Sequence, residues 1–72
     1  MEFLKHFKER NLERRINQIG RAQDPDEIYD CAHAIVKLSE TIYDSPMDSP
    51  HRKEYILSYG ILEDFQQKHT GN

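Results

Sequence analysis

The run from Asp24 to Tyr43 constrains the fold of this chain more than any other stretch. It opens with Asp-Pro-Asp-Glu, which offers an N-cap oxygen, a proline at the first helical position and a carboxylate three residues after the cap. The apolar residues that follow recur mostly at steps of three and four: Ile28, Cys31, Ala32, Ile35, Leu38 and Ile42. A second line, Tyr29, Val36 and Tyr43, runs beside them with a spacing of seven. The pattern predicts a helix over residues 25–43 whose apolar face is too broad for one neighbour, so this helix should be central.

A doubled phrase, Asp44-Ser45-Pro46 and Asp48-Ser49-Pro50, separates this helix from the next. The first copy should end the central helix, because a residue that precedes proline is disfavoured in the helical conformation. In the second copy, Ser49 can serve as N-cap with Pro50 at the first helical position, which predicts a third helix over residues 50–68. Phosphorylation of either serine by a proline-directed kinase is the alternative explanation of the phrase.

Residues 2–20 should form the first helix, and they carry two apolar stripes: Phe3, Leu4 and Phe7, followed by Leu12, Ile16 and Ile19. The step of five between the stripes rotates the second by about 140° at about 100° per residue. The helix therefore either breaks near residues 10–11 or continues and presents two faces to two neighbours. In a chain with little core, the first stripe is the strongest candidate for contact with another molecule.

The chain has 72 residues, so we expect one domain over residues 1–72 with a thin core. Its single cysteine cannot form an intramolecular disulfide, and no Cys/His cluster predicts a structural metal. The expected fold is all-α: a three-helix bundle, or a helical hairpin with an N-terminal helix. Because the apolar faces are broad, we also expect self-association, most simply as a two-fold homodimer with a seam along Tyr29, Val36 and Tyr43.

Charge is distributed unevenly along the chain. Residues 1–21 have a formal charge of +3 and residues 22–72 one of −6, which together give the net charge of −3. Four arginines of the first helix could contact phosphates: Arg10, Arg14, Arg15 and Arg21. Glu9 and Glu13 interrupt this basic stretch, and no recognition-helix pattern accompanies it. Nucleic-acid binding is therefore the alternative hypothesis and not the first.

No constellation predicts catalysis, a metal or a cofactor. The histidines are scattered, and the side chains of Cys31 and His33 diverge by about 200° around a helix, so a buried cysteine beside an exposed histidine is expected. The opening MEFLKHFKER has no apolar signal region, and no window approaches a membrane span. We expect a soluble, cytoplasmic protein that is not an enzyme and does not bind membranes.

These observations favour a small helical module that acts by contact with another protein, as an adaptor, an assembly factor or a stoichiometric inhibitor. The residues expected to bind the protein partner are Phe3, Leu4, Phe7, Tyr29, Val36 and Tyr43. A regulator that binds nucleic acid through the basic helix is the second hypothesis. A third is a small-ligand sponge with a pocket of tyrosine and arginine between subunits.

Overall fold

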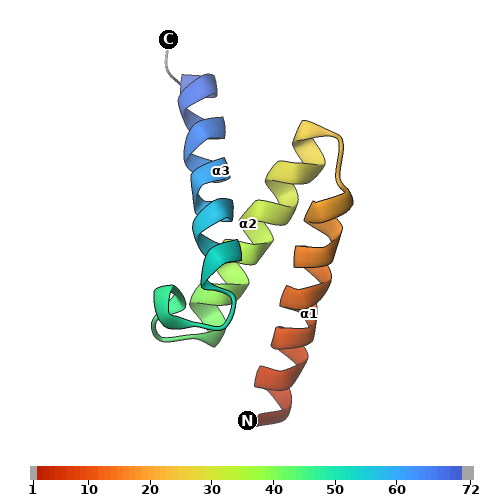
Figure 1. Cartoon of the computed structure of the whole chain (residues 1–72), viewed down its shortest axis with the longest axis vertical. Coiled ribbons are helices and arrows are strands. Elements are labelled where there is room, and N and C mark those ends of the chain that lie inside the picture. The colour runs from red at the N-terminus through yellow and green to blue at the C-terminus, as the bar shows by residue number, and fades with distance from the viewer. Residues whose placement is uncertain (1, 71–72) are drawn as a thin grey trace.

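The architecture is a bundle of helices around a central one (Figure 1). A computed structural model describes residues 2–70 and contains, in that range, α1 (Glu2–Arg21), α2 (Pro25–Ile42), the 3-10 turn η1 (Pro46–Asp48) and α3 (Arg52–Thr70). Helix α2 packs against α1 on one side and against α3 on the other. The predicted all-α, three-helix architecture is confirmed. The expected domain also includes Met1, Gly71 and Asn72, which lie outside the described residues.

Helix α2 begins where the proline signal predicts. Asp24 occupies the N-cap position in an extended conformation, with φ −86° and ψ 128°, and Pro25 is the first helical residue. The Asp24 carbonyl accepts a hydrogen bond from the Ile28 N–H at 2.9 Å, whereas its carboxylate makes no capping bond. The helix ends at Ile42, one residue before the predicted end, and the Tyr43 N–H still donates to the Ser39 carbonyl at 2.9 Å. The start of α2 therefore depends on the backbone preference of proline and on acidic residues in the first turn.

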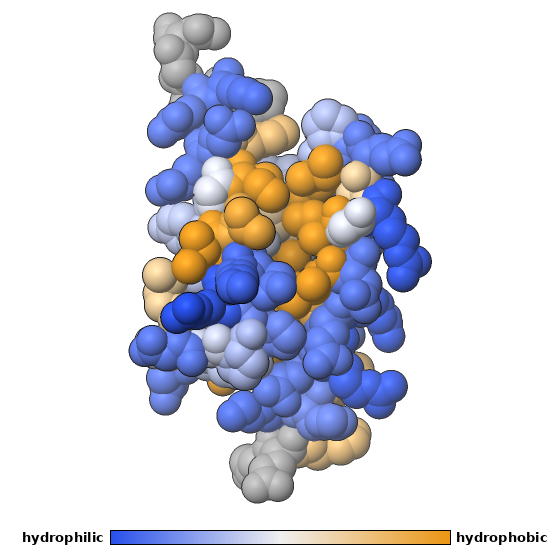
Figure 2. Space-filling view, in the orientation of Figure 1, coloured by the Kyte–Doolittle hydropathy of each residue, from blue (hydrophilic) through white to orange (hydrophobic). Residues whose placement is uncertain are grey.

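The core is thin and belongs mostly to α2, and in the space-filling view the hydrophobic residues gather over α2 between α1 and α3 (Figure 2). The buried apolar side chains of the described range are Leu12, Cys31, Ala32, Ile35 and Val36. Ser39 of α2 is also completely buried and Ser58 of α3 is 2% exposed. The Ser39 hydroxyl has no hydrogen-bond partner among the described residues. A small domain buries a small fraction of its surface, so few side chains reach full burial.

Helix α1 is continuous and does not break near residues 10–11, but only its second stripe is covered by a neighbouring helix, and the first stripe is exposed. No proline or glycine precedes Gly20, so no residue of the first turns strongly disfavours the helix. Its second stripe packs on α2, with Leu12 completely buried and Ile16 and Ile19 partly buried. The first turns of α1 extend beyond the loop that joins α2 to α3 (Figure 1). The molecule is correspondingly elongated, with extents of 44 × 24 × 17 Å.

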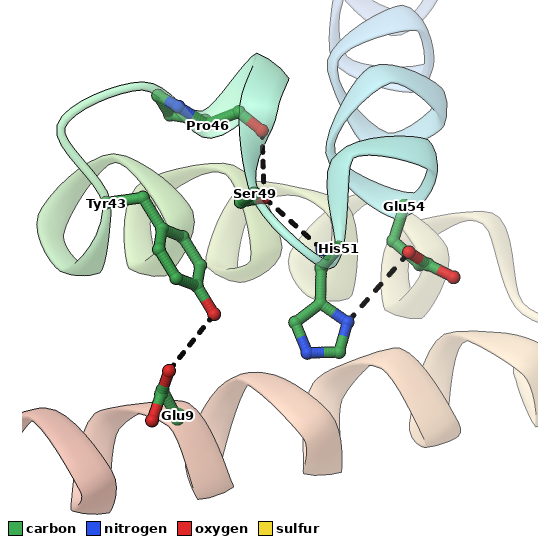
Figure 3. A network of polar contacts seen from close by, with 6 residues as sticks. All are labelled: Glu9, Tyr43, Pro46, Ser49, His51 and Glu54. Carbon is green, nitrogen blue, oxygen red and sulfur yellow. Dashed lines mark hydrogen bonds and ion pairs between the residues drawn. The ribbon is translucent and has the colours of Figure 1, made fainter.

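The doubled Asp-Ser-Pro phrase forms the corner between α2 and α3 (Figure 3). The Ser49 hydroxyl donates to the Pro46 carbonyl at 2.8 Å and accepts a hydrogen bond from the His51 N–H at 3.3 Å. Ser49 therefore ends the 3-10 turn η1 and accepts from the His51 N–H in the turn ahead of α3, but α3 starts at Arg52, two residues later than the helix start predicted at Pro50. Ser49 is 8% exposed, so its hydroxyl serves the corner and is poorly accessible to a kinase.

Candidate protein-interaction surface

The beginning of α1 is exposed on all sides. Phe3, Leu4 and Phe7 are 77%, 58% and 56% exposed, and the intervening Lys5 and His6 are exposed as well. We call these five residues the α1 prong. Soluble proteins rarely expose large apolar side chains as a group, and such a group commonly marks a binding site. The two phenylalanines and the leucine on this short exposed segment are therefore a candidate binding site.

The burial of Leu12 explains why Phe3 and Phe7 point away from α2. Leu12 follows Phe3 by nine residues, which is about two and a half turns at 3.6 residues per turn, so the two side chains lie on opposite sides of α1. Leu12 is completely buried where α1 packs on α2. Packing of Leu12 in the core therefore turns Phe3 away from it, and the continuous helix fixes that orientation.

Three arginines continue along the side of α1 on which Phe3 and Phe7 lie. Steps of four and three residues lead from Phe3 through Phe7 to Arg10 and Arg14, and Arg21 follows two turns later. The three arginines line one shallow groove together with Glu13, Asn17, Gln18 and Glu27. None of the three guanidinium groups forms an ion pair with a carboxylate of the described part of the chain. Their charges are available to a partner.

Arg15 is used differently from the other three predicted nucleic-acid contacts. Its guanidinium donates to the Gln18 side-chain oxygen at 3.2 Å, and the Gln18 amide donates to a Glu27 carboxylate oxygen at 3.3 Å. This chain of contacts links α1 to the first turn of α2. The structure thus brings Arg10, Arg14 and Arg21 together, whereas Arg15 bonds within α1 to Gln18, the residue that contacts α2.

The line Tyr29, Val36 and Tyr43, expected at a subunit seam, has neighbours within the chain. Tyr29 packs on Phe65 of α3 with 4.4 Å between ring centroids, and Val36 is 3% exposed. The Tyr43 hydroxyl donates to a Glu9 carboxylate oxygen at 3.2 Å, which ties the end of α2 to α1 (Figure 3). These contacts give the three side chains a role in holding the helices together and leave the prong as the exposed part of the predicted set.

Tyr43 is also electrostatically perturbed. Burial raises the pKa of Tyr43 above its usual value, and the negative charge of Glu9 beside the hydroxyl raises this pKa further. The phenol therefore stays protonated and continues to donate to Glu9 at pH values where an exposed tyrosine begins to ionise.

A second exposed apolar surface, which the sequence did not reveal, lies on α3. It is a groove lined by Glu40, Met47, Tyr55, Ile56, Tyr59, Gly60 and Glu63, and we call it the α3 groove. Met47, Ile56 and Tyr59 are 53%, 46% and 45% exposed. In the sequence, the apolar residues of α3 spread over more than one face, and this spread was the signal from which an exposed apolar surface on α3 could have been predicted. The contribution of Met47 from η1 and of Glu40 from α2 depends on the tertiary fold.

The remaining titratable groups form no further site within residues 2–70. No cluster of three or more histidine, cysteine or acidic side chains in that range could hold a metal ion. Cys31 is completely buried, and His33 is exposed beside Tyr29, with 6.2 Å between the ring centroids, as expected for the pair. None of the described helices is long and apolar enough to span a membrane.

Comparisons with known proteins give no family to start from. The chain matches no protein family, no curated protein and no solved structure. The function must therefore be inferred from the surfaces themselves.

Proposed function

We propose that the protein is a small, non-enzymatic helical module that docks on a larger protein through the α1 prong and the arginines beside it. The observation that carries this proposal is the exposure of Phe3 and Phe7 on the same side of α1 as the unpaired Arg10 and Arg14. Aromatic side chains and arginine are the residues most often found at the centre of protein interfaces.

The energetics of the prong favour docking. Covering a phenylalanine side chain removes about 150–250 Å² from water, and each Å² of apolar surface contributes about 25 cal/mol. Phe3 and Phe7 are only partly covered in the free protein, so a partner with an apolar pocket would gain most of that contribution. Carboxylates beside such a pocket would pair with Arg10 and Arg14 and orient the complex. The partner we expect has an apolar pocket on an acidic surface.

The absence of catalysis is part of the proposal. The Cys31 thiol is completely buried and forms no disulfide, so it is out of reach of a substrate. The grooves on the surface of the molecule are shallow. The groove that holds Arg10, Arg14 and Arg21 is lined by arginine, glutamate and amide side chains and contains no nucleophile. A free thiol in the core suits a reducing compartment, and we propose a cytoplasmic site of action.

The test is affinity capture followed by reconstitution. Partners captured from cells that express the protein would be identified by mass spectrometry with nuclease present, and the leading candidate would then be purified and titrated by calorimetry. We expect a one-to-one complex whose Kd rises at least tenfold in the Phe3→Ala/Phe7→Ala variant and is unchanged in Leu57→Ala. Leu57 is the matched control because it is 68% exposed and lies outside both grooves. Equal binding by both variants would refute docking through the prong.

Nucleic-acid binding is the second candidate, favoured by the three arginines that line one groove. Two carboxylates, Glu13 and Glu27, line the same groove and oppose a phosphate, which is why this candidate is second. A mobility-shift titration at low salt tests it. Binding that weakens steeply with salt and is lost in Arg10→Gln/Arg14→Gln would support it, and absence of a shift at low salt would refute it.

A further inference from the structure

Helix α1 carries a second periodic stripe on the side that faces away from α2 (Figure 1). Exposed residues recur along it at alternating steps of four and three, and we call them the outer stripe: Phe3, Phe7, Arg10, Arg14, Asn17 and Arg21. At about 100° per residue they lie within an arc of about 80°, with Leu12 on the opposite side of the helix. Alternating steps of four and three are the spacing by which one helix packs along another in a coiled coil.

The outer stripe changes in chemistry along its length. Its first two positions are the largely exposed Phe3 and Phe7, and the positions after them are arginines and one asparagine. None of the three guanidinium groups forms an ion pair with a carboxylate of residues 2–70. The stripe extends over about 27 Å at a rise of about 1.5 Å per residue. A matching surface must be apolar at one end and carry carboxylates along the rest.

The acidic neighbours of the outer stripe favour a protein over a uniform polyanion. Glu13 lies directly before Arg14 and flanks the stripe, in a position that commonly carries the charges paired across a coiled-coil seam. It repels a nucleic-acid backbone or an anionic lipid surface, whereas a protein can place a lysine or an arginine opposite it. Glu27, the other acidic residue of this groove, already accepts a hydrogen bond from Gln18.

A second copy of α1 does not satisfy the outer stripe. An antiparallel pair that used the whole stripe would set Arg10 of one copy against Arg14 of the other. In a parallel pair each arginine would face its own counterpart. Like charges that face one another across a contact are unfavourable. The occupant is therefore a different chain.

We propose that the outer stripe receives one amphipathic helix of the larger protein, with apolar side chains over Phe3 and Phe7 and carboxylates opposite the three arginines. This inference rests on the proposed function and names the element of the partner that docks. Acidic residues stabilise a helix best near its N-terminus. The docked helix carries its carboxylates in its first half, so it runs antiparallel to α1, from Arg21 toward Phe3. The apolar pocket expected on the partner then lies beside the last turns of this helix.

The probe for this proposal is a synthetic helical peptide of about 20 residues, which spans the stripe at about 1.5 Å per residue. From its N-terminus it repeats the complementary pattern at steps of four and three, with glutamates opposite the arginines, a glutamine opposite Asn17 and leucines over the phenylalanines. A lysine is placed to meet Glu13. A shuffled peptide of the same composition is the control. A single helix pair is smaller than a standard interface of about 800 Å² per partner, so we expect micromolar affinity.

The measurement is fluorescence anisotropy of the labelled peptides titrated with the full chain. We expect the probe to bind at least tenfold more tightly than the shuffled peptide. Equal binding of the two peptides, or no binding of the probe at high micromolar protein, overturns the proposal. Tighter binding of an oligonucleotide of equal charge, lost in Arg10→Gln/Arg14→Gln, would also overturn it and make the stripe a nucleic-acid site.

Charge-matched variants show whether the arginines act by position. Arg10→Gln/Arg14→Gln should raise the Kd of the probe at least tenfold. Lys37→Gln/Lys53→Gln removes the same charge from exposed positions of α2 and α3 and should change this Kd less than twofold. Equal losses in the two variants would mean general attraction of an acidic peptide and would overturn the proposal. Circular dichroism confirms that each variant is folded.

Exchange of one charge pair identifies the contact itself. Arg14→Glu should abolish binding of the probe, because two carboxylates then face one another. A probe with lysine in place of the glutamate opposite Arg14 should bind the Arg14→Glu variant at least tenfold more tightly than it binds the parent. That recovery supports the antiparallel pairing, and its absence overturns it.

The native partner separates this inference from the proposed function. If Phe3→Ala/Phe7→Ala weakens binding of the reconstituted partner but the probe binds no better than the shuffled peptide, the prong docks on something other than an acidic helix. Only this inference then fails. If the same variant leaves binding of the native partner unchanged, the proposed function fails, whatever the probe does.

Discussion

Replacement of Leu12 by alanine tests the orientation of α1, on which the direction of Phe3 and Phe7 depends. Leu12 is the completely buried apolar residue that α1 contributes to the core. Truncation of a buried leucine to alanine costs about 2–5 kcal/mol, because the transfer free energy of the removed atoms is lost and a cavity remains. A domain of 72 residues has a total free energy of unfolding of roughly 4–11 kcal/mol. Leu12→Ala should therefore remove a large part of the stability.

The assay is urea denaturation followed by circular dichroism, repeated at two protein concentrations so that any contribution of dimerisation is separated. Leu12→Met conserves volume and should cost less than about 1.5 kcal/mol. Leu57→Ala removes the same atoms from a side chain that is 68% exposed and should change the free energy of unfolding by no more than about 0.5 kcal/mol. If Leu12→Ala costs no more than Leu57→Ala, α1 is not packed through Leu12 and the argument for the prong fails.

Other substitutions test the remaining polar contacts by the same denaturation assay. Ser39→Ala removes a buried hydroxyl that lacks a partner among the described residues, so the free energy of unfolding should rise, by about 1 kcal/mol, and a fall would show a hidden partner. Tyr43→Phe removes the hydrogen bond to Glu9 and should lower the free energy of unfolding by about 1 kcal/mol, an effect that should vanish in a Glu9→Ala background, which has no side-chain acceptor. Because the pKa of Tyr43 is raised in the folded state, the unfolded chain loses this proton first; stability should fall as the pH rises above 10.0, and less so in Tyr43→Phe. Ser49→Ala removes the acceptor of the His51 N–H and should cost about 0.5–2 kcal/mol, and an unchanged midpoint would exclude a capping role.

The parts of the fold that could be predicted are those governed by local chemistry. Pro25 and the apolar spacing after it place α2, and Ser49 with Pro50 places the corner before α3, because proline geometry and helical periodicity act over a few residues. The continuity of α1 was not predictable in this way. Its two stripes allow either a break or a straight helix, and the outcome depends on how much of α1 the other helices can cover.

For the candidate surface, too, the local features could be predicted and the contacts between distant residues could not. The exposed apolar stripe at Phe3 and Phe7 was identifiable because it is out of phase with Leu12 along one helix. The contacts of Tyr29 with Phe65 and of Tyr43 with Glu9 join residues far apart in the sequence, and spacing alone cannot distinguish such contacts from a seam between subunits.

The thin core has a practical consequence for finding the partner. A ligand present at about a hundred times its Kd adds about 2.7 kcal/mol to the stability of the folded state by mass action. In a domain of 60–100 residues, each kcal/mol shifts the melting temperature by about 4–8 °C. Because few described side chains are fully buried, binding of a partner should be a large addition to a small free energy of unfolding, and the shift in melting temperature should be readily measured. Thermal scanning against candidate proteins and oligonucleotides would therefore rank the two classes of partner without any label, with the protein acting as its own reporter.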